Sequence, residues 1–487
     1  MTIRTLAAFA AFAAVAATVH AKSRDELAGS KPNVLVILCD DLGYGDLGCF
    51  GHPITRTPNL DRMASEGVRL TSCYSASPVC SPSRAGLMTG RTPSRTGVYD
   101  WIPDGHVAYL PESEVTIAEL LKQAGYDTCH SGKWHLNGKF NSDEHPQPGD
   151  HGFDHWFSTQ NNARPTHENP TNFVRNGEAV GPLEGYSCQL VADEAIGWLE
   201  GRTSDNPFFL FVCFHEPHER IASPPEITAT YLDDDGPKAR NKKQAEFFAN
   251  VTNMDAAVGR LLATLKERDI EEETLVVFTS DNGPETLSRS DHCYGSTGSL
   301  RGRKLWLYEG GIRVPGIVRW PGVLPAGEVN DKTVCSLDLL PTLCELASVA
   351  PPADRELDGT SLLPLFAGDP FRREKPLAWD YFNSLGDPKA VMRIGDFTIL
   401  GRRVSPDAET NHTRENVSPR TMPVIKAARL GKFELYDLRT DRAQTNDLAT
   451  RHRDQLEKFS QRLTRHHRGV REEGPVWEFP DENEPSK

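Results

Sequence analysis

The chain of 487 residues carries 54 Lys and Arg against 68 Asp and Glu, a formal net charge of -14. This acidic balance argues against a nucleic-acid partner, because phosphate binding needs an excess of cationic side chains. With 25% charged residues and only 10 cysteines in so long a chain, the composition excludes fibrous, broadly disordered and disulfide-scaffolded proteins.

Residues 1–21 have the pattern of an export signal. Arg4 supplies the positive start, residues 5–19 form an apolar run, and a small-x-small cleavage site ends at Ala21. The alternative is a membrane anchor, but this run falls short of the ~20 residues that span a bilayer. Since the sequence has no other long apolar stretch, we expect cleavage after Ala21 and a secreted or periplasmic protein without stable membrane insertion.

The mature chain opens with a strand-like segment and a helix-like one. Residues 34–38 are a continuous apolar run that ends abruptly in Asp40 and Asp41, which predicts a strand buried on both faces. Pro58 stands at the start of a short helical pattern, and Gly67 follows its end. Residues 57–67 are therefore predicted to contain a short helix.

The next helix is marked by its first turn. Thr116 and Glu119 have the spacing of a capping box, which predicts a helix that runs to Gly125. We expect a short strand over residues 126–130.

Three further segments complete the pattern. Residues 208–214 are apolar throughout, residues 247–265 carry apolar side chains at helical spacing, and residues 275–279 form a strand that ends in Asp281 and Asn282. Alternating strands and helices predict an α/β fold, with a mostly parallel sheet sandwiched by helices.

The pattern changes after residue 372. Short strands are predicted at residues 377–382, 397–400 and 433–438, followed by an amphipathic helix at 451–466 and, from residue 472, a loose acidic tail. We therefore expect a catalytic domain at 28–372, a smaller α+β domain with an antiparallel sheet at 373–471, and a tail at 472–487.

Two acidic clusters stand at the ends of predicted buried strands, Asp40-Asp41 and Asp281-Asn282. In open α/β sheets, ligands bind at the carboxyl ends of the strands. Carboxylate and amide oxygens suit Ca²⁺ or Mg²⁺, whereas turn formation is the alternative for either cluster alone. Together the clusters favour a divalent cation site.

The most specific segment is residues 80–91, with Cys80-Ser81-Pro82-Ser83-Arg84 at its start and Thr89-Gly90-Arg91 at its end. This C-x-P-S-R and T-G-R combination resembles the signature of the type I sulfatases of the alkaline phosphatase superfamily, in which the cysteine is oxidised to Cα-formylglycine. A hydrated aldehyde suits sulfate ester hydrolysis, because one hydroxyl attacks sulfur and the other expels the sulfate as the aldehyde reforms. Without the surrounding pattern, a buried structural thiol would be an equal interpretation of Cys80.

Further motifs of the family follow in the right order along nearly the whole chain. They are Gly132-Lys133-Trp134-His135, Pro217-His218 after a strand, Gly302-Arg303-Lys304, the E-G-G-I-R-V-P run at 309–315, and E-L-Y-D-L at 434–438. Each motif alone is weak, but chance hardly accounts for all of them. Within the family, the chain resembles enzymes of the N-acetylgalactosamine-6-sulfatase and arylsulfatase A type.

The resemblance implies a cation site and a maturation partner. It implies that the cation, usually Ca²⁺ and alternatively Mg²⁺, is held by Asp40, Asp41, Asp281 and Asn282, with the modified Cys80 completing the shell. It also implies that a formylglycine-generating enzyme acts on Cys80 during biosynthesis.

The resemblance further implies the catalytic roles. Arg84 and Lys133 orient the formylglycine hydrate, while Lys133 and Lys304 hold the sulfate oxygens. His218 or Lys304 donates a proton to the leaving sugar oxygen, and His135 is the base that triggers sulfate release. His215, three residues before His218, is interpreted as a substrate-binding or supporting residue.

A sulfated saccharide is the expected substrate. Residues 148–164 combine His, Asp, Asn and aromatic side chains as a sugar site does, with a structural loop as an equal alternative; residues 99–101 and His106 are further candidates. Where the family pattern is usually P-H-x-P, this chain has Arg220 in place of the second Pro. Because the chain is acidic, local cations must concentrate positive potential in the cleft; the candidates are Arg84, Lys133, Lys304 and Arg313.

Two competing functions remain at this stage. A phosphate mono- or diester hydrolase of the same superfamily commonly uses a Thr or Ser nucleophile with two metals, and needs more His and Asp ligands. A non-catalytic relative that binds sulfated glycans would not need the charged candidates found here. The sugar and the sulfate position stay open.

Overall fold

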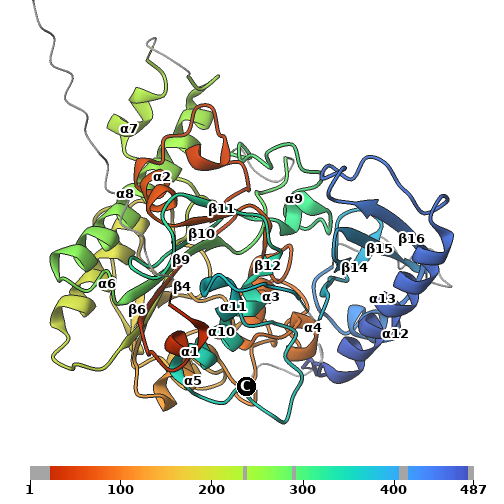
Figure 1. Ribbon diagram of the computed structural model, residues 1–487. Helices are drawn as coiled ribbons and strands as arrows, with labels where there is room; N and C mark the ends of the chain where they lie inside the picture. Colours follow the sequence, from red (N-terminus) through yellow and green to blue (C-terminus); the bar gives the residue numbers. More distant parts are fainter. Residues whose placement is uncertain (1–21, 234–237, 288–291, 374, 405–414, 481–487) are drawn as a thin grey trace, which may run out of the picture.

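A computed structural model of the chain describes residues 22–233, 238–287, 292–373, 375–404 and 415–480 (Figure 1). The expected export signal, residues 1–21, lies outside the described residues. Among the helices that are described, none has the length and apolar character needed to cross a membrane.

A ten-stranded sheet forms the centre of the larger part of the molecule. Its middle strands run parallel in the order β9 (Thr274–Ser280), β1 (Asn33–Cys39), β8 (Phe208–Cys213), β4 (Asp127–Lys133) and β5 (His155–Thr159). On one side the sheet continues through β10 (Gly316–Arg319), β2 (Val68–Leu70) and β11 (Glu328–Asn330), and on the other through β6 (Val174–Arg175) and β7 (Glu178–Ala179). The predicted mostly parallel sheet is thereby confirmed.

The continuous apolar run of β1 is explained by burial of both faces. Val34, Val36 and Leu38 pack into one hydrophobic core, whereas Leu35 and Ile37 pack into the other. Because successive side chains of a strand point to opposite faces, an uninterrupted apolar run is required only where both faces are covered.

Helices provide this cover on both sides (Figure 1). One core receives side chains of α3 (Cys80–Thr89), α5 (Ile117–Gln123) and α10 (Leu339–Ala347); the other receives those of α2 (Pro58–Glu66), α6 (Ser187–Gly201) and α8 (Lys242–Glu267). The capping box of α5 is present as predicted, with Thr116 and Glu119 bonded to each other's main chain. Helix α8 starts earlier than predicted, because its first turn is polar and is capped by Asn241.

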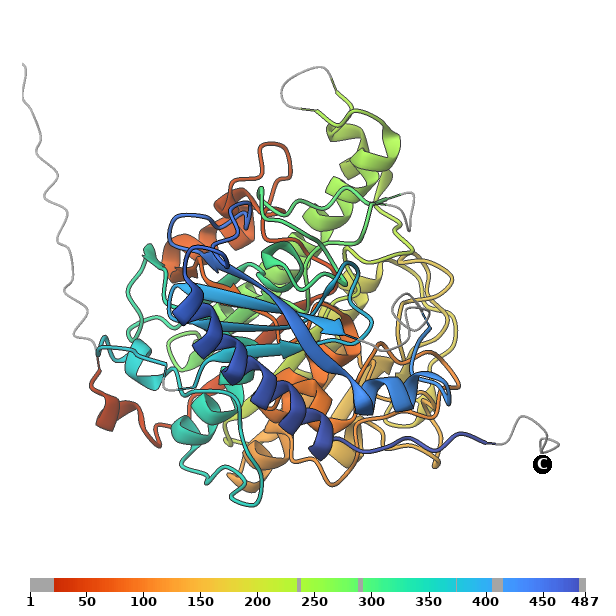
Figure 2. The ribbon, with the colours of Figure 1, turned by 90° about the vertical axis from the view of Figure 1, so that its right-hand side faces the viewer.

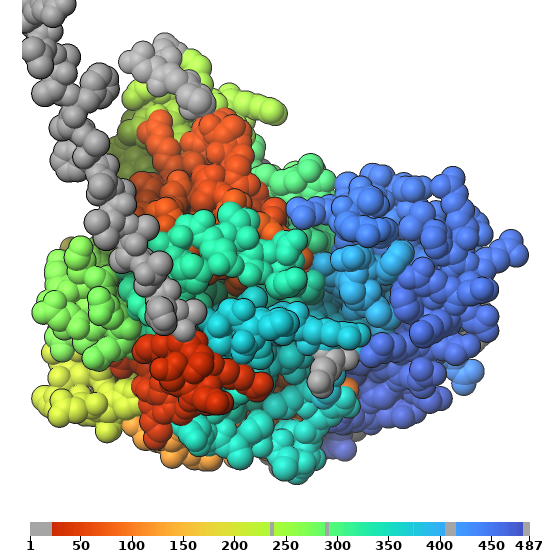
Figure 3. All heavy atoms as spheres, in the orientation of Figure 1, coloured from red at the N-terminus to blue at the C-terminus, as the bar shows by residue number. Residues whose placement is uncertain are grey.

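The C-terminal part is an antiparallel sheet of β13 (Leu377–Asp380), β14 (Pro388–Ile394), β15 (Phe397–Val404) and β16 (Arg429–Asp437). Helix α13 (Arg453–Glu473) lies across it, as Figure 2 shows. In Figure 3 this part (blue) packs along one side of the larger part. Trp379 of β13 connects the two, because its Nε1 donates to the Ser75 carbonyl at 2.7 Å.

Two expectations for this end of the chain were wrong. The predicted helix over 451–466 continues to Glu473, whose carboxylate is bound by Arg91 and Arg95. The residues after it, up to 480, are packed rather than loose: the Tyr99 hydroxyl donates to the Pro475 carbonyl at 2.7 Å, and Trp477 Nε1 donates to the Gly97 carbonyl at 2.8 Å. Aromatic side chains among the acidic residues account for this packing. The net charge of the segment alone does not predict it.

Candidate active site

The two acidic clusters meet because their strands are neighbours. Strands β1 and β9 pair in parallel with Cys39 opposite Ser280, so the next residues, Asp40 and Asp281, leave the same edge of the sheet side by side. The Asp281 amide donates to the Cys39 carbonyl at 3.0 Å, and the Asp41 amide donates to Asp281 Oδ1 at 3.2 Å. All four side chains of the clusters are buried.

The end of a third strand, β4, places a lysine ammonium group beside these carboxylates. Lys133 is the last residue of β4, which runs three residues beyond the predicted 126–130. Its Nζ donates to Asp40 Oδ2 at 2.5 Å and to Asn162 Oδ1 at 3.2 Å. The side chain of Lys133 is completely buried, so this ion pair lies in a medium that strengthens it.

Helix α3 places the cysteine and an arginine beside the same cluster. Arg84 donates from Nε and Nη2 to Asp281 Oδ2 at 3.2 and 2.9 Å, and from Nη1 to the Lys133 carbonyl at 2.7 Å. Cys80 is the first residue of this helix and is 3% exposed. Burial raises the pKa of its thiol to about 11, although Lys133 and Lys304 oppose the shift. An unmodified Cys80 is therefore a thiol at neutral pH and a poor nucleophile.

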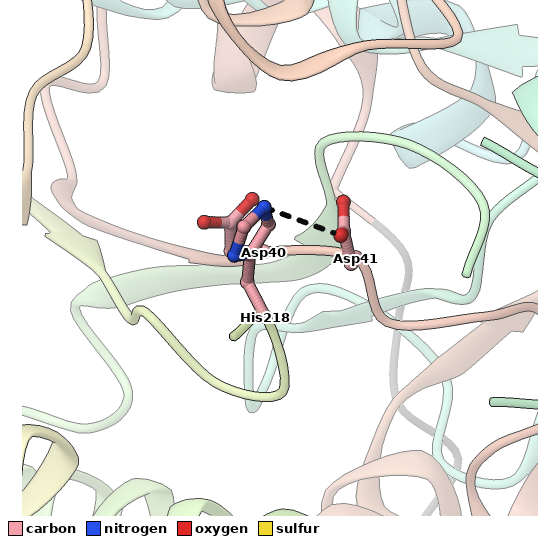
Figure 4. Close-up of side chains that lie close together, drawn as sticks. All are labelled: Asp40, Asp41 and His218. Carbon is pink, nitrogen blue, oxygen red and sulfur yellow. Dashed lines mark ion pairs between the residues drawn. The ribbon is translucent and has the colours of Figure 1, made fainter. Parts of the chain in front are cut away.

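Two loops complete the cluster. Lys304 donates from Nζ to Asp41 Oδ2 at 2.7 Å and lies 3.4 Å from Glu285 Oε2. His218 Nε2 lies 3.6 Å from the same Asp41 oxygen, as the dashed line in Figure 4 shows. Because its Nδ1 faces the Glu219 carbonyl at 2.8 Å, Nδ1 carries the hydrogen and Nε2 is the basic nitrogen of the neutral ring.

The three carboxyl groups differ in their affinity for protons. Burial acts to raise the pKa of Asp40, but Lys133, His218 and Arg84 outweigh it and hold that pKa well below its usual value. Burial raises the pKa of Asp41 to about 7, despite Lys304. Burial together with neighbouring Asp40 likewise raises the pKa of Asp281 to about 7. Burial therefore disfavours the charged forms of Asp41 and Asp281, a cost that a bound cation would offset.

The donor set fits a divalent cation. Asp40 Oδ1 and Asn282 Oδ1 are buried and have no hydrogen-bond partner among the described residues, while Asn282 Nδ2 donates to Asp41 Oδ1 at 2.7 Å. Ligand atoms of Asp40, Asp41 and His218 gather within 4.8 Å of one another, a group that adds His218 to the predicted ligands. Two buried oxygens without a hydrogen bond, beside the carboxyl groups of Asp41 and Asp281 with their raised pKa values, match the preference of Ca²⁺ and Mg²⁺ for oxygen ligands.

The two other predicted histidines are buried nearby without contacting the carboxylates. His135 follows β4 and places Nε2 3.1 Å from the Ile102 carbonyl; its Nδ1 has no partner within the described chain. His215 places Nε2 2.8 Å from Thr159 Oγ1. Burial lowers the pKa of both rings well below the usual value, so both are neutral near pH 7.

Sequence reasoning missed one residue and misplaced others. Glu285 lies 3.4 Å from Lys304, and the only available signal was that it follows the end of β9 within a few residues. Asn162, which accepts from Lys133, lies within the expected stretch 148–164. Arg313 was expected in the cleft, but Glu309 neutralises it in a separate buried pair at 2.5 Å.

Most of the expected sugar-binding stretches are structural. Residues 148–151 and 155–159 form a 3-10 turn and β5. His106 places Nε2 2.9 Å from the Val417 carbonyl, and Asp100 accepts from the Tyr381 hydroxyl at 2.8 Å.

Comparison with known proteins now defines the class. The sulfatase family model matches residues 32–349, so the chain belongs to the sulfatase family and is a sulfuric ester hydrolase with the alkaline-phosphatase-like fold that the sequence predicted.

Individual relatives agree with this assignment. The chain is 35% identical to the N-acetylgalactosamine-6-sulfatase of Canis lupus familiaris over 396 residues, which cover 76% of this chain and 72% of the relative. It is 38% identical to the arylsulfatase A of Homo sapiens over 360 residues, 69% and 68% of the two chains. The crystal structure of Ps i-CgsB in complex with k-i-k-neocarrahexaose superposes with a TM-score of 0.76 at 26% identity, over 92% of this chain and 94% of that one.

Proposed function

We propose that the protein is an exported sulfatase that removes sulfate from a carbohydrate, with a nucleophile formed from Cys80. The observation that carries this proposal is the position of Cys80, buried at the start of α3 among Arg84, Lys133 and Lys304. Cations around this side chain suit a sulfate ester, whereas the raised pKa of the thiol makes the unmodified cysteine unfit to attack it. The names of the N-acetylgalactosamine-6-sulfatase and of the Ps i-CgsB complex support a saccharide substrate.

Lys133 and Lys304 are proposed to hold the sulfate oxygens. Each ammonium group has three N–H donors: Lys133 donates one to Asp40 and one to Asn162, and Lys304 donates one to Asp41. The carboxylates fix the lysines in place, and the remaining donors stay available to a substrate anion. Charge-assisted hydrogen bonds to the sulfate then strengthen as negative charge develops on its oxygens.

Asp40, Asp41, Asp281 and Asn282 are proposed to hold Ca²⁺ or Mg²⁺. When bound, the cation supplies positive charge that polarises a sulfate oxygen and the nucleophile. The orphaned oxygens of Asp40 and Asn282 support this assignment. Arg84 keeps Asp281 oriented through its two hydrogen bonds to Oδ2.

Proton transfer is assigned to histidines and a lysine. The Glu219 carbonyl holds the His218 ring through Nδ1, so Nε2 must first take up a proton, which the ring then passes to the leaving sugar oxygen. Lys304 is the second candidate for this donor. His135, kept neutral by burial, is assigned as the base for the second hydroxyl of the hydrated formylglycine.

The experiment replaces Cys80 and compares sulfate with phosphate esters. Cys80→Ala should reduce 4-nitrophenyl sulfate hydrolysis to background while circular dichroism stays unchanged; Cys49→Ala, at a remote free thiol, is the matched control and should retain activity. The peptide that contains Cys80, from protein made in its natural host, should have the mass of formylglycine. Full activity of Cys80→Ala, or faster turnover of 4-nitrophenyl phosphate than of the sulfate, would contradict the proposal.

A further inference from the structure

A cavity of about 650 Å³ adjoins the candidate active site. It is lined by residues 162–165, by Thr171 and by residues 219–220. These segments follow β5 and β8, two of the parallel strands whose carboxyl ends surround the acidic cluster. Its size lies in the range of small-molecule binding sites.

The wall of this cavity touches two residues assigned to the reaction. Asn162 Oδ1 accepts from Lys133 Nζ at 3.2 Å, and the Glu219 carbonyl contacts His218 Nδ1 at 2.8 Å. A sugar whose sulfate reaches Lys133, and whose bridging oxygen reaches His218, would have Asn162 and Glu219 beside it. The cavity is where the rest of that saccharide would lie.

The cavity carries an excess of positive charge. Arg220 is exposed, and its guanidinium makes no hydrogen bond or ion pair with any described residue. Arg164 lies 3.5 Å from Asp104, but both side chains are more than half exposed, so their pairing is weak. The one acid of the lining is Glu219, whose Oε1 lies 3.7 Å from His292 Nδ1.

Arg220 is held by its main chain rather than by its side chain. Its carbonyl accepts from the amide of buried His167 at 3.1 Å. A change of the Arg220 side chain therefore leaves its main-chain contact in place.

We propose that Arg220, assisted by Arg164, binds a second anionic group on the saccharide that carries the scissile sulfate. A guanidinium presents a planar pair of donors that matches either a sulfate or a carboxylate. The preferred substrate is then a multiply charged saccharide, with a second sulfate or a uronate, rather than a singly sulfated neutral sugar. This inference rests on the proposed sulfatase function and specifies its substrate class.

The test compares saccharides that carry one or two anionic groups. N-acetylgalactosamine 6-sulfate, N-acetylgalactosamine 4,6-disulfate and the disaccharide of glucuronate with N-acetylgalactosamine 6-sulfate compete with 4-nitrophenyl sulfate, and their apparent inhibition constants are measured. In the native enzyme, at least one doubly charged saccharide should bind about tenfold more tightly than the singly charged one, as expected for one charge-assisted contact. The two doubly charged probes distinguish a sulfate from a carboxylate as the second anion.

Variants test whether the preference for a doubly charged saccharide depends on the side chain of Arg220. Arg220→Gln should reduce the tenfold preference to about twofold or less, Arg220→Lys should keep part of it, and added salt should weaken it. Arg268→Gln, an equal charge change at an exposed residue after α8, is the matched control and should keep the preference. An unchanged preference in Arg220→Gln, or no preference in the native enzyme, overturns the proposal.

The same design separates this proposal from the proposed function. If mature native enzyme does not hydrolyse 4-nitrophenyl sulfate, the sulfatase mechanism fails. The three saccharides are then titrated by calorimetry, and the ratio of their dissociation constants in native protein and Arg220→Gln tests the cavity by itself.

Discussion

At the residue scale, the site is a set of buried charges that face one another. Arg84, Lys133 and Lys304 face Asp40, Asp41 and Asp281, and Glu285 also lies beside Lys304. A divalent cation added to this set would make it positive, so that it would attract a sulfate although the chain as a whole has a net charge of -14. The acidic surface and an anionic substrate are therefore compatible.

The two candidate proton donors can be separated by the leaving group. His218→Asn should slow hydrolysis of a sugar sulfate by ~100-fold or more, because a sugar alkoxide needs a proton as it leaves. Hydrolysis of 4-nitrophenyl sulfate should slow far less, since nitrophenolate leaves unprotonated. Steady-state kcat on both substrates is the measurement.

The variant Lys304→Met should differ from His218→Asn in its effect on the two substrates. Because Lys304 is assigned to hold sulfate as well, its loss should slow both substrates. Equal losses on the two substrates in His218→Asn would remove His218 from the role of proton donor.

The sequence allowed prediction of those site residues that follow regular patterns. Asp40 and Asp281 could be found because long apolar runs end directly before them. The contacts of Asn162 and Glu285 could not, because they depend on how irregular loops return to the cluster. The roles assigned to all of these residues stay predictions until the variants are measured.

At the element scale, apolar runs and helix caps allowed helices and strands to be predicted from the sequence. Strands that mix apolar and charged residues could not be predicted in this way. Strands β1, β8 and β9 were predicted within a residue of their ends, because both faces are buried. Strand β14 was missed, since Lys389 and Arg393 interrupt its apolar pattern. Their polar ends find partners inside the fold, Lys389 on the Ser384 carbonyl at 2.5 Å and Arg393 on Ser72 Oγ at 3.0 Å.

The cap of α5 provides a prediction at this scale. Thr116 Oγ1 accepts from the Glu119 amide at 3.2 Å and donates to the His151 carbonyl at 2.8 Å. Thr116→Ala should therefore lower the free energy of unfolding by about 1–2 kcal/mol. The urea midpoint measures this change. Thr116→Ser keeps the hydroxyl and should lose much less, whereas equal losses in both variants would indicate that the methyl group matters instead.

At the scale of the whole molecule, Asp380 connects the C-terminal sheet to two other parts. It accepts from Arg471 Nη2 at 2.8 Å and from Ser94 Oγ at 3.1 Å, and it pairs with His467. Burial opposes ionisation of Asp380, but Arg471 and His467 hold its pKa well below the usual value. The domain boundary between residues 372 and 373 stays a prediction, and of these contacts the hydrogen bond from Ser94 is the one that crosses it.

The pH dependence of stability follows from this depressed pKa. Asp380 binds a proton more readily in the unfolded chain, so its contribution is complete above the unfolded pKa of about 4 and is lost as pH falls toward the folded value. Asp380→Asn should cost about 3–5 kcal/mol at pH 7, and the deficit should shrink by pH 3. Urea unfolding at both pH values measures it. Asp387→Asn, at an exposed carboxylate, is the control; a deficit for Asp380→Asn that is equal at both pH values would contradict the assignment.

The contact between Arg91 and Glu473 has a consequence for the timing of synthesis. These residues are 382 positions apart, and Arg91 stands two residues after the end of the helix that Cys80 begins. At ribosomal rates, roughly 20–80 s pass between the appearance of Arg91 and that of Glu473. Throughout that interval, the helix that Cys80 begins lacks the contact between Arg91 and Glu473. The expected maturation enzyme would thus meet the cysteine on a growing chain, before the final fold leaves it 3% exposed.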